Sequence, residues 1–420
     1  MSITNNSNKL FILNLLTAAL AACGGGGSST STTSSSGSNN SSSSGSSNNS
    51  SSGNSSSTGS SNNSSSSSNT NTTVNHALFV SFTPANSTCA LLCDTINAYS
   101  INNSTGALQF TAASDSSTAP YEVDVTPSGK FAYAAGVNGT SHVIYQYTYG
   151  ASGSLTPLAT PMVYTTSNNL KVAFDLSGAF AIVPTNGAAS SLVTYKIDST
   201  TGALQTAQTL LTQDQTSDHI TDVVTNPVSG IIYAAIYNAT SSTTTINAYS
   251  LNTSTDALTQ VSSTSVAGYV ETIKIDPTGK YLYVPTTNNN QGGVAEYNIG
   301  TNGSLTPMST AFISQPSFTG GNIAIDSSGQ YAYLPINPTS GSGAIAQYTI
   351  GTNGVLTPMS VTSVPVNESV SSVNAVGNYV YAVSHTSIHG YSIGSTGLLS
   401  SLSATTYSTN SITLQAVTVY

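Results

Sequence analysis

Five polar residues occupy one position of a sequence repeat, and three of them are charged. Glu122 lies five residues before Pro127, which begins a Pro-Ser-Gly turn, and the equivalent positions before later turns hold Lys171, Asp222, Thr272 and Asn322. Carboxylates and a lysine that come together can bind a small polar ligand or an ion. They can equally form an ion pair in a solvated wall that binds nothing. Both interpretations require that the five positions face one common space.

The repeat that carries these residues is about 49 residues long and occurs seven times between Tyr99 and Leu399. Its signature is Tyr-x-[Ile/Leu/Tyr] followed by Gly-x-Leu. In one unit, residues 272–275 alternate in polarity, 276–279 form a turn, and strands are expected over 280–284, 294–299 and from 305. Each unit therefore predicts four antiparallel strands, and a repeat of this length predicts blades around an axis. The first strand of each blade would line the central channel, with the polar positions near one mouth.

The predicted fold is an all-β, seven-bladed β-propeller over residues 74–420. The chain starts with a second-strand pattern at 76–80, and the run 412–417 at its end has no blade of its own. We expect the C-terminal strand to complete the N-terminal blade, which closes the ring and leaves no exposed strand edge. Turn positions in both hairpins of each blade should have positive φ. They are Gly129, Gly178, Gly230, Gly279, Gly329, Gly377, Gly106, Gly153, Gly202, Gly303, Gly354, Gly397 and, in one glycine slot, Asp256.

Residues 277–284, Pro-Thr-Gly-Lys-Tyr-Leu-Tyr-Val, and the Tyr-x-Ile plus Gly-x-Leu pair resemble the seven-bladed lactonase-type propeller superfamily. This superfamily includes 6-phosphogluconolactonase-like proteins and the YVTN-repeat proteins. The resemblance covers about residues 76–420 and implies the fold, because its motifs lie on turns and on packing aromatics. A phosphosugar lactonase needs cationic groups for the phosphate. This chain has no arginine, and no position matches a catalytic residue of the family, which argues against phosphorylated substrates.

Charge is scarce, since 5% of residues are charged and the formal net charge is −9. A chain without a basic patch is not expected to bind nucleic acid. Its surface polarity must come from Ser, Thr, Asn and Gln, which suits an exported protein. We expect a monomer. No cofactor is expected, and the chain has no Cys-x-x-Cys-His motif for covalent haem. It also lacks the Gly-x-Ser-x-Gly elbow of an α/β hydrolase.

Residues 1–22 predict a signal peptide, with one Lys and an apolar run that is too short to span a bilayer. The sequence Leu-Ala-Ala-Cys-Gly ending at Gly24 resembles the lipobox of bacterial lipoproteins, which implies lipidation of Cys23 and anchoring in the membrane. Gly24 after the Cys favours the outer membrane, with the domain periplasmic or surface-exposed. The alternative is an ordinary secretory signal in which the Cys is incidental.

Residues 23–73 contain the lipidated Cys and then only Gly, Ser, Thr and Asn, so we expect a disordered tether. Cys89 and Cys93 are predicted to form a small-loop disulfide, and the alternative is two reduced thiols. Asp214, Asp218 and Asp222 are weak candidates for a calcium site, because their spacing matches no known metal loop. His76, His142, His385 and His389 lack acidic neighbours in sequence and are expected to be structural.

These observations favour an envelope-anchored binding module that recognises a protein or glycan partner through its loops and channel mouth. The alternative is a lactonase-like hydrolase of neutral lactones or sugars that uses Glu122, Lys171 and Asp222. A structural spacer without a ligand is a third hypothesis.

Overall fold

The structure is a computed structural model of the chain. It describes residues 76–82, 95–114, 119–165, 171–187, 190–213, 217–288, 291–315, 317–318, 320–338, 342–384, 387–402, 407–408 and 413–419. The signal peptide, Cys23, the tether, Cys89, Cys93 and Asp214 lie outside the described residues. Within these ranges there is no helix of the length and apolarity that a membrane span requires.

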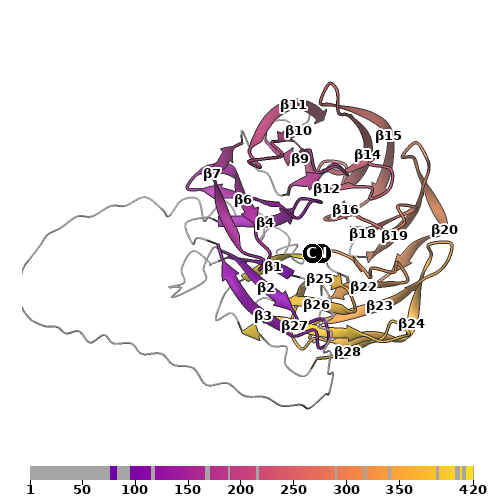
Figure 1. Ribbon diagram of the computed structural model, residues 1–420. Coiled ribbons are helices and arrows are strands. Elements are labelled where there is room, and N and C mark those ends of the chain that lie inside the picture. The colour runs from indigo at the N-terminus through magenta and orange to yellow at the C-terminus, as the bar shows by residue number, and fades with distance from the viewer. Residues whose placement is uncertain are drawn as a thin grey trace, which may run out of the picture.

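The described residues form seven antiparallel sheets arranged as blades around a central axis (Figure 1). Blades one and two comprise β30 (Thr413–Val419), β1 (His76–Phe82), β2 (Thr95–Ile101), β3 (Leu108–Ala113), and β4 (Ala119–Val125), β5 (Phe131–Asn138), β6 (Ser141–Tyr149), β7 (Leu155–Tyr164). Blades three and four comprise β8 (Ala173–Phe174), β9 (Phe180–Thr185), β10 (Ser190–Ile197), β11 (Leu204–Gln213), and β12 (Asp218–Thr225), β13 (Ile232–Asn238), β14 (Thr243–Asn252), β15 (Ala257–Ala267).

Blade five contains β16 (Tyr269–Val270), β17 (Lys274–Ile275), β18 (Tyr281–Asn288), β19 (Gln291–Ile299) and β20 (Leu305–Ser314). Blade six contains β21 (Ala324–Ile325), β22 (Tyr331–Ile336), β23 (Ala344–Ile350) and β24 (Leu356–Pro365). Blade seven contains β25 (Val370–Val376), β26 (Tyr379–Ser384), β27 (Ser387–Ile393), β28 (Leu399–Ser401) and β29 (Tyr407–Ser408). In Figure 1 inner strands such as β4, β12 and β25 lie nearest the axis, and strands such as β7, β15 and β20 lie at the rim. The all-β, seven-bladed prediction is confirmed.

Blade one is completed by both ends of the described chain. β30 pairs antiparallel with β1, where Ala77 lies opposite Val419. The sheet order β3-β2-β1-β30 gives the C-terminal strand the inner place that other blades give to their first strand. The ring therefore closes as predicted, and the inner edge of β1 has a hydrogen-bonded partner.

The predicted turn positions all have positive φ, including Asp256 with φ 62°. Gly354, with φ 81°, shows what a side chain would meet, because an added Cβ would lie 2.5 Å from the Tyr281 ring. Asp256 occupies the glycine position of one outer turn, and its carboxylate accepts a hydrogen bond from Lys196 Nζ at 2.9 Å. The outer turns are thus packed against the preceding blade and are not free loops.

A tyrosine on the second strand of a blade donates a hydrogen bond to the outer turn of the next blade. The pairs are Tyr133–Gly202, Tyr233–Gly303, Tyr283–Gly354, Tyr333–Gly397 and Tyr381–Gly106, with Oη to carbonyl distances from 2.6 to 3.1 Å. The last of these pairs joins blade seven to blade one. Blade three has Ile182 in place of the tyrosine, and there Thr194 Oγ1 donates to the Asp256 carbonyl at 3.0 Å. The tyrosines of the repeat therefore connect adjacent blades.

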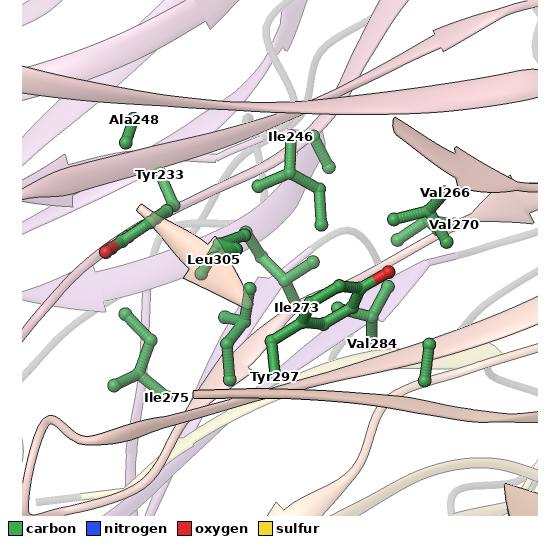
Figure 2. Packing of buried hydrophobic residues seen from close by; sticks show 13 residues of the cluster. Tyr233, Ile246, Ala248, Val266, Val270, Ile273, Ile275, Val284, Tyr297 and Leu305 are labelled. Atoms are coloured by element: carbon green, nitrogen blue, oxygen red, sulfur yellow. The ribbon is translucent and has the colours of Figure 1, made fainter. Parts of the chain in front are cut away.

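The hydrophobic core consists of separate clusters between neighbouring blades. In one of them, Tyr233 and Ile246 of blade four pack with Ile273, Val284 and Tyr297 of blade five (Figure 2). Alternation explains this arrangement, since one set of residues on each strand faces the next blade. Burial of this apolar surface stabilises each blade contact, at roughly 25 cal/mol per Å² removed from water.

The inner strands are irregular at the position of the five predicted polar residues. In blades two, four and seven the pairing with the second strand shifts immediately before Glu122, Asp222 and Ser372. In blades three and six the short inner strand begins only after the equivalent residue, and in blade five that residue lies between the short strands β16 and β17. The predicted strand over 272–275 is accordingly too long, because only Lys274–Ile275 is paired there. Such bulges and breaks turn a side chain away from the regular pleat.

Candidate functional site

Lys171 lies between two carboxylates from the neighbouring blades. Its Nζ is 2.9 Å from Asp222 Oδ1 and 3.9 Å from Glu122 Oε1. Asp222 is 4% exposed, and its oxygens also accept hydrogen bonds from the backbone N–H groups of Val223 and Ile273, both at 2.8 Å. Glu122 is 32% exposed. Asp222 is therefore held by the fold, whereas Glu122 keeps an accessible carboxyl group.

Two further charged residues belong to this cluster, and neither was singled out from the sequence. Asp124 lies two residues after Glu122 on β4, and Lys274 lies on β17 of blade five. Both interact electrostatically with Lys171 and Asp222. Since side chains alternate along a strand, the step of two residues from Glu122 was a usable signal for Asp124. We call Glu122, Asp124, Lys171, Asp222 and Lys274 the channel cluster.

Burial and charge shift the pKa values of the channel cluster in opposite directions. Burial raises the pKa of Glu122 to about 8 and that of Asp124 to about 6, although Lys171 opposes both shifts. Burial alone would lower the pKa of Lys171, but the carboxylates of Asp222, Glu122 and Asp124 outweigh it and raise the pKa. Lys171 is thus cationic at neutral pH, and Glu122 holds a proton up to about pH 8.

The other two predicted residues, Thr272 and Asn322, bind the backbone of the following blade. Asn322 Nδ2 donates to Val373 O at 2.6 Å, and its Oδ1 accepts from Val373 N at 2.9 Å. Thr272 Oγ1 donates to Gly321 O at 3.3 Å. The structure therefore brings Glu122, Lys171 and Asp222 together and gives Thr272 and Asn322 a role in joining blades.

The weak calcium candidates have separate partners. The Asp218 carboxylate accepts a hydrogen bond from Asn238 Nδ2, whereas Asp222 binds Lys171, and Asp214 lies outside the described residues. No group of three His, Cys, Asp or Glu residues in the described ranges is placed to hold a metal ion. The channel cluster offers carboxyl groups for proton transfer and the Lys171 ammonium for charge stabilisation.

Comparison with known proteins gives one family match and many structural likenesses. The model of the family described as "Lactonase, 7-bladed beta-propeller" matches residues 231–334, about a quarter of the chain and from β13 to β22. No curated protein matches the chain.

Solved structures share the fold at low sequence identity. The "putative 6-phosphogluconolactonase" of Bacteroides fragilis NCTC 9343 has a TM-score of 0.65 and 17% identity, over 84% of this chain and 99% of that chain. A protein of the same description from Bacteroides uniformis ATCC 8492 gives 0.64 and 17%, over 83% and 100%. The periplasmic gluconolactonase of Pseudomonas aeruginosa gives 0.62 and 14%, over 82% and 99%. The shared ring shows that the chain has the seven-bladed β-propeller fold of these structures, and residues 231–334 of that ring resemble the lactonase propeller family.

Proposed function

We propose that this chain is a lactonase-like hydrolase that opens a small neutral sugar lactone at the channel cluster. The observation that carries the proposal is the position of Lys171 between two carboxyl groups. Asp222 is buried and already hydrogen-bonded, whereas Glu122 is partly exposed. The family match and the periplasmic gluconolactonase among the structural likenesses support the same reaction class.

Glu122 and Lys171 would have complementary roles in lactone hydrolysis. The Lys171 ammonium has three donors, of which one binds Asp222, so the others can stabilise the oxyanion that forms at the lactone carbonyl. Glu122 would take a proton from the attacking water and return it to the ring oxygen as the carbon–oxygen bond breaks, which gives the hydroxy acid. Because burial raises the pKa of Glu122 to about 8, kcat/KM should increase as pH rises through about 8.

The charge of the channel cluster favours a neutral substrate. The channel cluster has three carboxyl groups and two lysines. Burial and the charge of Lys171 both lower the pKa of Lys274, which weakens its hold on a positive charge. A phosphate in this space would meet Asp124 and Asp222 without a guanidinium to neutralise it. We therefore place phosphorylated lactones outside the substrate range of this chain.

The test is hydrolysis of D-glucono-1,5-lactone by the full chain, measured in a pH-stat against the spontaneous rate. Wild type should exceed the spontaneous rate, and Glu122→Gln should reduce kcat about 100-fold or more with an unchanged melting temperature. The matched control is Glu296→Gln, which alters a buried acid of blade five outside the channel cluster and should retain full turnover. Equal rates for wild type and Glu122→Gln would remove Glu122 from the reaction.

A second candidate is a non-catalytic binding module held at the cell envelope, favoured by the lipobox-like sequence at Cys23 and the polar tract 24–73. In this hypothesis the protein is an outer-membrane lipoprotein that recognises a protein or glycan. Mass spectrometry of Cys23 after expression in a bacterium tests the anchor, and Cys23→Ala should abolish lipidation. A ligand that raises the melting temperature without being turned over would favour binding over hydrolysis.

A further inference from the structure

Blade seven contains a cavity of about 330 Å³ that is separate from the channel cluster. The loop that connects β24 to β25 forms one side of it, and β27 and β28 form the other. Its polar lining includes Asn367, Glu368, His389, Tyr391 and Ser401. A space of this size is in the range that holds a small ligand.

The cavity lies on the side of blade seven that faces blade six. Tyr391 packs in the cluster between these two blades, and His389 lies on the same face of β27, because side chains alternate along a strand. Gly390 lies between them, so a side chain at this position would point to the opposite face, toward blade one, as Ile388 does. The cavity is therefore bounded by one face of β27 and by the loop 365–368.

The histidine in the lining lies beside a carboxylate. His389 Nε2 is buried without a hydrogen-bond partner, 3.7 Å from Glu368 Oε1. Ser387 Oγ donates to the same Glu368 oxygen at 3.1 Å, and Tyr391 Oη donates to Pro365 O at 3.3 Å, which fixes the connecting loop. A neutral imidazole has one N–H donor and one acceptor nitrogen, so it can bond a hydroxyl group in either sense. Glu368 and His389 are 21 residues apart in the sequence, so no local motif indicates the pair.

We propose that this cavity is a second binding site, for a neutral polyhydroxylated ligand such as one sugar unit. His389 and Glu368 accept hydrogen bonds from hydroxyl groups, whereas Asn367 and Ser401 can donate as well as accept. Glu368 is the one acid and no lysine lies among the described lining residues, so an anionic ligand would be repelled. The buried Tyr391 supplies an apolar wall against which carbon–hydrogen faces can pack.

The test uses the full chain with methyl β-D-glucopyranoside as probe, in saturation-transfer NMR followed by a titration. Glu368→Ala is the decisive variant, because it removes the carboxylate acceptor from the lining. We expect Glu368→Ala to keep a melting temperature close to that of wild type, since this side chain is 36% exposed, and to weaken binding at least tenfold. His389→Asn should weaken binding about tenfold. His142→Asn is the matched histidine control on β6 and should leave binding unchanged.

Three outcomes would overturn this site: no signal for wild type, wild-type affinity in Glu368→Ala, or equal binding of glucose 6-phosphate. Glu122→Gln separates the two proposals. If that variant abolishes glucoside binding while Glu368→Ala does not, the sugar lies at the channel cluster and the blade-seven site is wrong. If turnover is absent but Glu368→Ala abolishes binding, the hydrolase proposal fails and this site stands.

Discussion

Glu296 is a carboxyl group in a slot where two other blades have glutamine. In blade two, Gln146 Oε1 accepts from Leu204 N at 2.7 Å and its Nε2 donates to Thr160 O at 2.8 Å. Glu296 Oε1 likewise accepts from Leu356 N at 2.7 Å, but its Oε2 is buried without a partner. Burial raises the pKa of Glu296 to about 7. The protonated carboxyl can supply the donor that the amide supplies elsewhere.

The pKa of Glu296 predicts a pH-dependent stability. The unfolded chain loses this proton near pH 4.5 and the folded chain near pH 7, so the free energy of unfolding should fall as pH rises between these values and be lowest above 7. Glu296→Gln should remove this loss and add about 2–3 kcal/mol at pH 8, with little effect at pH 4.

Denaturant unfolding at pH 4 and pH 8 measures the effect. Gln347→Glu is the reciprocal control and should introduce the same pH dependence into blade six. The prediction is wrong if the difference in the free energy of unfolding between Glu296→Gln and wild type is the same at pH 4 and at pH 8. Ionisation of the buried carboxyl would then not destabilise the fold.

At the residue scale, the sequence was informative where one position recurs in register. Aligning the repeats on their turns selected Glu122, Lys171 and Asp222, which the structure brings together. The same alignment selected Asn322, whose amide instead satisfies both backbone groups of Val373, because identical register does not imply identical chemistry. The Glu368–His389 pair depends on how a connecting loop meets β27, and no local pattern encodes that contact.

At the scale of elements, the outer turns carry the contact between blades. Gly354 has φ 81°, and a Cβ there would overlap the Tyr281 ring at 2.5 Å. Gly354→Ala should therefore cost about 2–4 kcal/mol, from backbone strain together with overpacking. Asp256→Gly should change stability by less than about 1 kcal/mol, because relief of a positive φ offsets the loss of a partly exposed pair with Lys196.

Thermal denaturation of these two variants side by side tests whether the turns pack against the neighbouring blade. If Gly354→Ala were as stable as Asp256→Gly, the Tyr281 ring would have room to move and the close contact would not restrain the turn.

The turn glycines and the order of strands could be predicted because turn chemistry and alternation are local signals. The irregular inner strands could not. The strand pairing shifts by one residue before Glu122 and Asp222, and Lys171 lies before the start of its short strand. No local sequence pattern predicts these irregularities. The residues at these breaks contact neighbouring blades, as Asp222 contacts Lys171 and Ile273, so the irregularity depends on the assembled ring.

For the whole molecule, closure depends on β30. Removal of residues 412–420 would leave the inner edge of β1 without hydrogen-bond partners. We expect a lower melting temperature and self-association, since an unpaired edge recruits other strands. Light scattering coupled to size-exclusion chromatography measures the association, and a deletion of equal length within 24–73 is the control. A monomeric truncated protein of unchanged stability would mean that β30 contributes nothing to closure.

The pairing of Ala77 with Val419 also fixes which face of the ring the preceding chain approaches. In blade two the equivalent pair is Ala132 with Val125, beside the turn at 126–129. Residue 76 therefore emerges on the face of the turns, and the connections between blades, such as 365–368, run on the opposite face. If the chain is anchored through Cys23 as proposed, the tether joins the ring on the face of the turns and leaves the opposite face, with the connections between blades, free of the attachment.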